Sequence, residues 1–279
     1  MKNGPRADQV KADSGMPKNL FKERLRAGEL QIGLWLAMAD PYAASIAGYA
    51  GFDWLVVDGE HGPNDLRSIL NQLLALEASA SSVVVRPPMS ESWFIKQLLD
   101  IGCQTLLVPM VETAEQAQAL VRAVRYPPRG IRGMGAAIAR SSRFNTIPDY
   151  VAHADDSICL LVQVESRLGI DNLEAIAAVD GVDGVFIGPA DLAANLGLPG
   201  RIDTPEVPHV VEDAIQKIRA ADKPAGILTF SEPLNQRYIQ LGASFVAVGA
   251  DVTEFSLSLA NLRNLYNADS NGASVEAGY

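Results

Sequence analysis

The chain has 279 residues, 48% of them apolar, and a formal net charge of −10 from 23 basic and 33 acidic side chains. This length suits a single domain with a large core. The acidic balance argues against nucleic acid or an anionic membrane as a partner. Cys103 and Cys159 stand outside any CxxC motif, so we expect small buried apolar residues and no disulfide.

The two ends of the sequence are polar and contain glycine. We expect disordered tails at residues 1–18 and 268–279, around one domain at 19–267. The opening residues have no apolar core, so no signal peptide is expected. Since no apolar run approaches the ~20 residues that cross a bilayer, the expected location is the cytoplasm.

Apolar, β-branched segments recur along the domain. Because they are nearly continuous Val, Ile and Leu runs, they predict parallel strands covered on both faces. The predicted strands are 31–36, 53–58, 82–86, 105–110, 158–165, 184–188, 224–228 and 245–249.

Helical patterns fill the intervals between these strands. Apolar residues in 66–74 repeat with helical spacing, Thr113 and Gln116 form a capping-box pattern, and 231–242 is bounded by Ser and Gly. Eight strands that alternate with helices predict a single-domain (β/α)₈ TIM barrel.

One interval is longer than a single helix needs. The segment 126–150 holds four arginines and three glycines. Long loops in compact domains are often functional, and we expect this one on the active face because it follows a strand. Its Arg132, Arg140 and Arg143 either meet a substrate carboxylate or contact another subunit.

Acidic residues follow two neighbouring strands. Glu165 and Asp191 come at strand ends, where TIM barrels carry their chemistry. Two carboxylates suit a hard cation such as Mg²⁺ or Mn²⁺, with Co²⁺ a further option. The alternative is structural: Glu165 pairs with Arg167, and Asp191 caps a helix.

Arg86 and His61 also stand at strand ends. Arg86 could stabilise a developing oxyanion or form a structural ion pair with Asp58 or Glu60. His61 is a candidate base, oriented by Asp58, or a structural histidine.

The motif GPAD offers the amides of Ala190 and Asp191 as an anion site, or it is an ordinary tight turn. Together, a cation, an anion site, an arginine and a base suit enolate formation from a 2-oxo acid. The metal would chelate the acid's oxygens, the arginine would stabilise the enolate, and the base would move the proton.

Six motifs in this order resemble the HpcH/HpaI aldolases over about residues 21–265: DWLVVDGEHGPND, VVVRPP, QTLLVPMVET, RGIRGMG with ARSSRF, LVQVES and VFIGPADLAANLG. The resemblance implies a TIM barrel, assembled as a hexamer that exchanges its C-terminal helix between subunits. It also implies metal-dependent cleavage of 4-hydroxy-2-oxo acids into an aldehyde and pyruvate, or a related 2-oxo acid such as hydroxypyruvate.

The resemblance assigns roles to residues of this chain. It makes His61 the base, Arg86 the enolate-stabilising group, and Glu165 and Asp191 the metal ligands. It makes Asp100, from a neighbouring subunit, the acid that raises the basicity of the histidine, whereas the residue pattern alone favours Asp58. The substrate contacts it implies are Gln163, Gly188, Pro189, Ala190, Asp191, Trp35 and Leu228, and Met134 and Leu228 fall where members vary in how they fit the aldehyde.

Two other functions fit parts of the sequence. A lyase of CoA esters could use a similar cation site, although no basic cluster for the CoA phosphates is evident outside 126–150. A metal-binding barrel without catalysis is the non-enzyme alternative, and the complete set of acid, base and metal positions argues against it.

Overall fold

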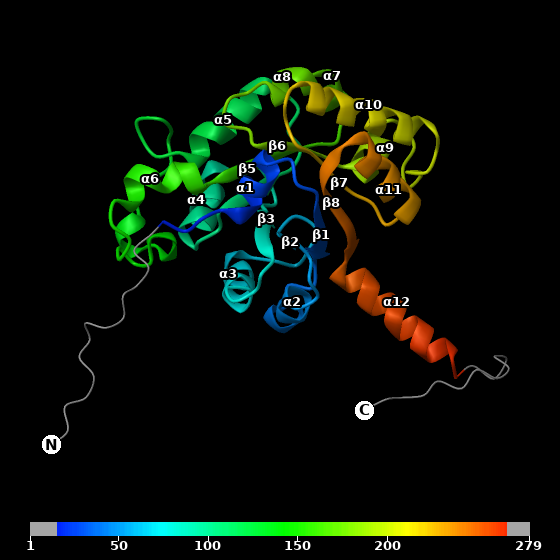
Figure 1. Cartoon of the computed structure of the whole chain (residues 1–279), viewed down its shortest axis with the longest axis horizontal. Coiled ribbons are helices and arrows are strands. Elements are labelled where there is room, and N and C mark those ends of the chain that lie inside the picture. The colour runs from blue at the N-terminus through cyan, green and yellow to red at the C-terminus, as the bar shows by residue number, and fades with distance from the viewer. Residues whose placement is uncertain (1–15, 267–279) are drawn as a thin grey trace.

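The computed structural model describes residues 16–266, in which eight parallel strands close into one barrel with helices around it (Figure 1). This confirms the predicted (β/α)₈ fold. The strands are β1 (Gln31–Leu36), β2 (Trp54–Asp58), β3 (Ser82–Arg86), β4 (Thr105–Val108), β5 (Cys159–Val164), β6 (Gly184–Ile187), β7 (Ala225–Leu228) and β8 (Ala243–Ala250).

Helices connect the successive strands, and one further helix stands before β1 and one after β8. They are α1 (Leu20–Arg26), α2 (Pro41–Gly48), α3 (Leu66–Ala75), α4 (Ser92–Asp100), α5 (Ala114–Val124), α6 (Tyr150–Ser157), α7 (Arg167–Asp171), α8 (Leu173–Ala177), α9 (Pro189–Asn195), α10 (Glu206–Ala220), α11 (Glu232–Leu241) and α12 (Asp251–Asn264), with short 3₁₀ turns η2 (Ala136–Ile138) and η3 (Arg140–Ser142). None of the helices in the described part of the chain is long and apolar enough to span a bilayer.

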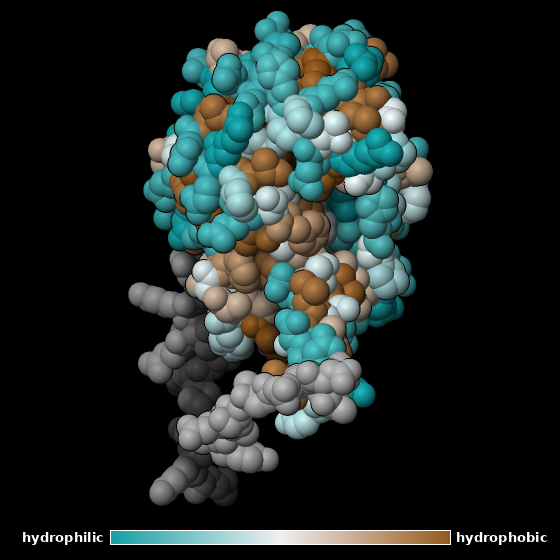
Figure 2. Space-filling model, turned by 90° about the vertical axis from the view of Figure 1, so that its right-hand side faces the viewer, coloured by the Kyte–Doolittle hydropathy of each residue, from teal (hydrophilic) through white to brown (hydrophobic). Residues whose placement is uncertain are grey.

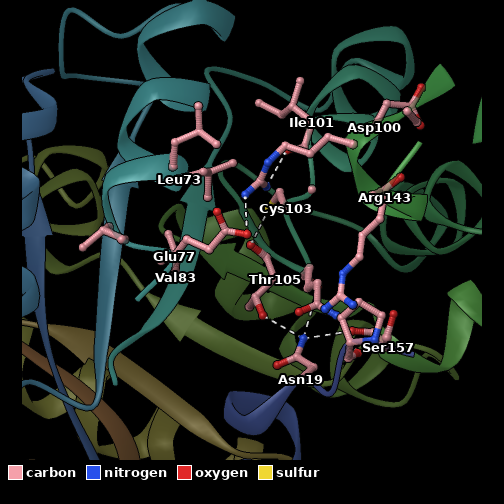
Figure 3. Close-up of a pocket in the computed structure, with 18 of the residues that line it drawn as sticks. Asn19, Leu73, Glu77, Val83, Asp100, Ile101, Cys103, Thr105, Arg143 and Ser157 are labelled. Carbon is pink, nitrogen blue, oxygen red and sulfur yellow. Dashed lines mark hydrogen bonds and ion pairs between the residues drawn. The ribbon is translucent and has the colours of Figure 1, made fainter. Parts of the chain in front are cut away.

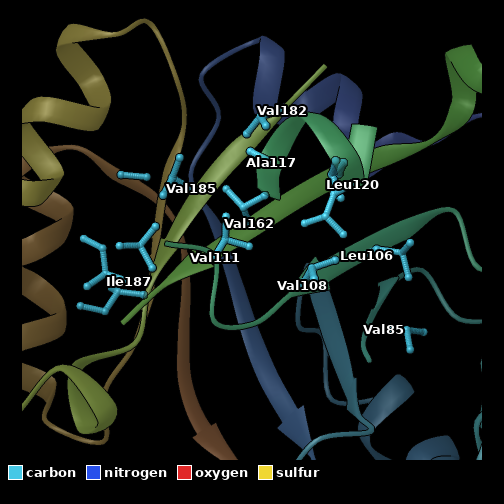
Figure 4. Packing of buried hydrophobic residues seen from close by; sticks show 14 of the residues in the cluster. Val85, Leu106, Val108, Val111, Ala117, Leu120, Val162, Val182, Val185 and Ile187 are labelled. Atoms are coloured by element: carbon cyan, nitrogen blue, oxygen red, sulfur yellow. The ribbon is translucent and has the colours of Figure 1, made fainter. Parts of the chain in front are cut away.

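The core has two layers. Between the strands and the helices, side chains such as Val162 of β5 and Leu120 of α5 pack together (Figure 4). Inside the barrel, the rings of Trp54 and Phe245 pack 5.9 Å apart. Phe21 of α1 lies 5.5 Å from Trp54, so α1 closes the N-terminal end of the barrel. Both layers are apolar, which explains why the strands read as continuous apolar runs.

The sequence patterns located most element boundaries. The capping box of Thr113 and Gln116 is present at the start of α5. Gly242 ends α11 in the left-handed region, at φ 99°. Cys103 and Cys159 are both buried and free, as predicted. Strand β4 is shorter than the predicted 105–110, because the chain turns at Met110, which has φ 56°.

The predicted position of the segment 126–150 was wrong. It follows α5, which has already returned the chain to the N-terminal ends of the strands, so it does not lie at the active face. Arg132 is fully buried against Asp100 and the Tyr126 ring. Arg140 binds the carbonyl of Ile101. These arginines therefore hold the segment to α4 within one chain.

Two features concern the ends of the chain. The predicted tails lie mostly outside the described residues, although Pro17 is described and its carbonyl accepts a hydrogen bond from Gln104. At the other end, α12 projects away from the barrel (Figure 1), and none of its residues is buried within the chain.

Candidate active site

Asp58 and Arg86 form the centre of the site at the C-terminal ends of β2 and β3, where they are register partners. The arginine Nε and Nη2 donate to the two carboxylate oxygens of Asp58 over 2.8 and 2.7 Å. Both side chains are buried. The ladder between two strands therefore fixes a bidentate ion pair, a geometry that holds the guanidinium plane in one orientation.

Arg86 has two further neighbours. Its Nη1 lies 2.8 Å from Oε2 of Glu60, and its Cζ stands 5.2 Å above the ring of Trp35. Both ion-pair alternatives predicted for Arg86 are therefore present together. Only 7% of this residue is exposed, so three contacts fix a cation at the centre of the barrel mouth, the space at the C-terminal ends of the strands.

The environment of Asp58 keeps its carboxylate ionised. Burial is the largest single influence and raises the pKa. The hydrogen bonds and charge of Arg86 and the amides of Glu60 and His61 lower the pKa, and together they outweigh the effect of burial. The pKa of Asp58 therefore lies below its ordinary value. A carboxylate in this state is a poor proton acceptor and a good anchor for a cation.

Asp58 also shapes the loop that carries His61. Its Oδ1 accepts hydrogen bonds from the amides of Glu60 and His61 over 3.0 and 3.4 Å, and its carbonyl accepts from the side chain of Asn64. Asp58 thus contacts the backbone of His61, while His61 itself is exposed at the mouth. The expected effect of Asp58 on the basicity of the imidazole stays a prediction.

Glu165 follows β5 and is 3% exposed. Its Oε1 accepts from the amide of Met110 over 2.9 Å, and its Oε2 accepts from Gln163 Nε2. These two contacts replace the proposed pair with Arg167. A Cβ at Gly188 would collide with Oε2 of Glu165, so glycine at the end of β6 leaves the room that this carboxylate occupies.

Three carboxylates, which follow β2, β5 and β6, influence one another here. Burial raises the pKa of Glu165, and the charges of Glu60 and Asp191 raise it further, against the hydrogen bonds from Gln163 and Met110. Burial also raises the pKa of Glu60, and Asp58 and Asp191 add to the rise while Arg86 and His61 oppose it. Uncompensated negative charge of this kind fits a divalent cation.

The donor set also fits such an ion chemically. Within residues 16–266, no three His, Cys, Asp or Glu side chains lie close enough to enclose a metal. Two carboxylates, Glu165 and Asp191, leave coordination positions for water and substrate oxygens, which is how Mg²⁺ is commonly held.

The GPAD motif begins α9. Gly188 is the N-cap and Pro189 the first helical residue, so Asp191 lies in the first turn and does not occupy the cap position. Asp191 and Ala190 are exposed, whereas Gly188 is buried. The capping alternative is therefore not realised at Asp191.

The other predicted substrate contacts line the inside of the mouth. Gln163 is 2% exposed, and its Oε1 has no hydrogen-bond partner among the described residues. Leu228 packs on the inner cluster that contains Trp35. A polar amide and apolar walls thus border the space in front of Arg86.

Asp100 and Met134 lie at the other end of the barrel. Asp100 ends α4 and binds Arg132 over 2.9 Å. It borders a groove of about 1040 Å³ beside the starts of β3 and β4 (Figure 3). Met134, in the segment after α5, is exposed. Neither residue joins His61 within one chain, so a role at the site requires a neighbouring subunit.

Sequence reasoning missed one contributor. The amide of Met110 orients Glu165, and the next amide, of Val111, donates to the carbonyl of Gln163 over 3.0 Å. Any residue except proline supplies an N–H, so this contribution leaves no signal in the sequence.

The combination of these strand-end residues can be compared with known proteins. The model of the HpcH/HpaI aldolase/citrate lyase family matches residues 31–257. The chain belongs to this family. The resemblance in the strand-end motifs is thereby confirmed.

Three members show the range of similarity. The hydroxypyruvate/pyruvate aldolase of Agrobacterium fabrum is 63% identical over 263 residues, which cover 94% of this chain and 99% of the relative. The 4-hydroxy-2-oxo-heptane-1,7-dioate aldolase of Salmonella paratyphi C is 55% identical over 236 residues, covering 85% and 90%. A crystal structure of a family protein from Burkholderia cenocepacia has a TM-score of 0.85 at 37% identity, covering 90% of this chain and 100% of that one.

Proposed function

We propose that this protein is a carbon–carbon lyase, a class II pyruvate aldolase. It reversibly cleaves 4-hydroxy-2-oxo acids into an aldehyde and pyruvate, or a related 2-oxo acid such as hydroxypyruvate. The names of the similar aldolases support this activity. The observation that carries it is the guanidinium of Arg86, which Asp58 and Glu60 hold at the barrel mouth.

Glu165 and Asp191 are the residues that would hold a divalent cation, Mg²⁺ or Mn²⁺ or, as a further option, Co²⁺. When bound, this ion supplies positive charge that stabilises the negative charge developing on the 2-oxo acid. Gln163 and the backbone at Gly188–Asp191 would bind the carboxylate end of the substrate, with Trp35 and Leu228 as apolar walls.

His61 and Arg86 would carry out the proton and charge transfers. In cleavage, His61 accepts the proton of the C4 hydroxyl, the C3–C4 bond breaks, and its electron pair moves into the enolate of pyruvate. Arg86 donates a hydrogen bond to the enolate oxygen, and its fixed orientation requires little reorganisation as the charge develops. Protonation of C3 then gives the methyl group of pyruvate.

We also propose a homo-oligomer, a hexamer by resemblance, as the working form. The exposed apolar residues of α12 support this proposal. Figure 2, viewed from the side of α12, shows apolar residues gathered in the lower half of that face. Contiguous exposed apolar surface commonly marks a protein contact. The other expected partners are small-molecule substrates. We expect no binding to nucleic acid or to a membrane.

The first test is the loss of the pyruvate methyl signal by proton NMR in D₂O. Metal-stripped protein should leave the signal unchanged, and added Mg²⁺ or Mn²⁺ should start the exchange, because enolate formation needs no aldehyde. Glu165→Gln is the matched variant and should remain inactive with either metal. Full exchange in excess chelator would contradict the proposal, and no exchange with either metal would direct attention to CoA esters.

A further inference from the structure

An acidic residue outside the proposed catalytic set holds the loop after β1. Asp251 follows β8 and begins α12. Its Oδ1 accepts from the amide of Ala37 over 2.8 Å, and its Oδ2 accepts from the amide of Met38 over 3.3 Å. The first residue of the projecting helix is thus bonded to the loop between β1 and α2.

The peptide group between Ala37 and Met38 reaches the loop that carries His61. Its N–H points to Asp251, and its carbonyl points the opposite way, as in any trans peptide. A Cβ at Gly62 would lie 3.2 Å from this carbonyl and 2.6 Å from the carbonyl of Asp58. Gly62, next to His61, therefore packs closely between the two carbonyls, an approach that suits glycine.

The loop after β1 does not hold this path by its own preference. Ala39 has φ 56°, in the left-handed region that alanine seldom adopts. Asp251 supplies two hydrogen bonds immediately before this residue. The carboxylate is therefore a fixed anchor for a loop that would otherwise sample other peptide orientations.

We propose that Asp251 is a positioning residue for His61. Asp251 fixes the peptide group between Ala37 and Met38. The carbonyl of this peptide group packs against Gly62 and so restrains the segment Gly59–Gly62. Asp58 holds the same segment from the barrel side, through the amides of Glu60 and His61. The inference rests on the proposed function, in which His61 moves the proton.

The test compares Asp251→Ala and Asp251→Asn with Glu254→Gln. Alanine removes both acceptors, and asparagine keeps the size but replaces one acceptor by a donor. Glu254 lies in the same first turn of α12, so its substitution controls for the loss of one charge near a helix N-terminus.

We expect kcat for pyruvate methyl exchange to fall about ten- to a hundredfold in Asp251→Ala, because small displacements of a reacting group have effects of this size. The pyruvate KM and the Kd for Mn²⁺ should stay within about twofold, since Glu165 and Asp191 follow β5 and β6 and lie away from this loop. Asp251→Asn should be intermediate, and Glu254→Gln should match the parent. Hydrogen–deuterium exchange should quicken at Ala37 and Met38.

Three results would overturn the inference. Asp251→Ala and Asp251→Asn could both match Glu254→Gln in kcat. The loss of kcat could be accompanied by an equal loss of Mn²⁺ affinity. It could also be accompanied by a smaller assembly in light scattering. If instead the parent itself shows no metal-dependent exchange of the pyruvate methyl protons, the proposed function has failed. Faster amide exchange at Ala37 and Met38 in Asp251→Ala would then still show that Asp251 holds this loop.

Discussion

Arg86 is held by its neighbours before any substrate binds. Asp58 accepts hydrogen bonds from two of its nitrogens, and Glu60 forms an ion pair with the third. The sequence named these acids as alternatives for one ion pair, because residue order does not tell how many side chains share one guanidinium. The register of β2 and β3 places Asp58 opposite Arg86, and Glu60 follows two residues later, so both acids lie close to the guanidinium. The structural and the functional interpretation of Arg86 are therefore compatible.

The ion pair predicts how stability depends on pH. The pKa of Asp58 lies below its ordinary value of 3.8, so folding favours the ionised form. Asp58 therefore stabilises the fold above pH 3.8, and this contribution is lost as the pH falls through the lower pKa of the folded state. Asp58→Asn should lower the free energy of unfolding by about 3 kcal/mol near pH 7, because it leaves a buried arginine partly unpaired.

Urea unfolding measures this effect between about pH 7 and pH 3. The difference between Asp58→Asn and the parent should narrow once the pH falls below 3.8, the ordinary value for this carboxyl. Asp156→Asn, at an exposed position of α6, is the control for the loss of one carboxylate. A difference that stays constant over the whole range would show that the charge of Asp58 is not what stabilises the fold.

Among the elements, the end of β4 shows where sequence reasoning stops. The apolar run predicted a strand over 105–110, but β4 ends at Val108. Met110 adopts φ 56°, and its amide donates to Glu165. Hydrophobic pattern locates a strand, whereas the turn that ends it depends on a contact with the neighbouring strand's acid. The same limit applies to the segment 126–150. Its composition suggested the active face, but α5 comes between β4 and this segment and carries the chain to the opposite end of the barrel.

This turn predicts that two substitutions at Met110 differ in their cost. Met110→Gly keeps the amide and suits the left-handed region, so the free energy of unfolding should stay within about 1 kcal/mol of the parent. Met110→Val should lose about 1–3 kcal/mol, because a β-branched residue is strained there. Mn²⁺ affinity, measured by calorimetry, should be kept in Met110→Gly and weakened in Met110→Val. Equal Mn²⁺ affinities in the two variants would show that the turn at Met110 does not position Glu165 for binding the ion.

At the scale of the whole molecule, α12 touches the barrel only near its start and buries none of its residues within the described chain. Val252, Phe255, Leu259 and Leu262 repeat at helical spacing along one side, and all are about half exposed. Leu259→Glu should therefore reduce the size of the assembly without unfolding the barrel, since no residue of α12 is buried in the chain. Size-exclusion chromatography with light scattering measures this. Asn261→Glu, on the opposite side, should assemble normally, and an unchanged assembly in Leu259→Glu would contradict the proposed contact.

The location of Asp100 makes a second prediction about the assembly. Asp100 lies at the N-terminal end of its own barrel, bound to Arg132, whereas His61 lies at the C-terminal end. If Asp100 serves the site of a neighbouring subunit, the variants Asp100→Asn and His61→Asn are each inactive alone. The first variant still supplies His61, and the second still supplies Asp100. Mixed oligomers then contain sites in which His61 comes from one variant and Asp100 from the other.

Random mixing of the two variants should restore activity at about a quarter of the sites, because each site draws its two residues from independently chosen subunits. The measurement is pyruvate methyl exchange after the variants are dissociated and reassembled together. Each variant reassembled alone is the control and should stay inactive. Since a role of Asp100 within its own chain cannot be complemented by another chain, a mixture as inactive as the controls would show that Asp100 does not act across the interface.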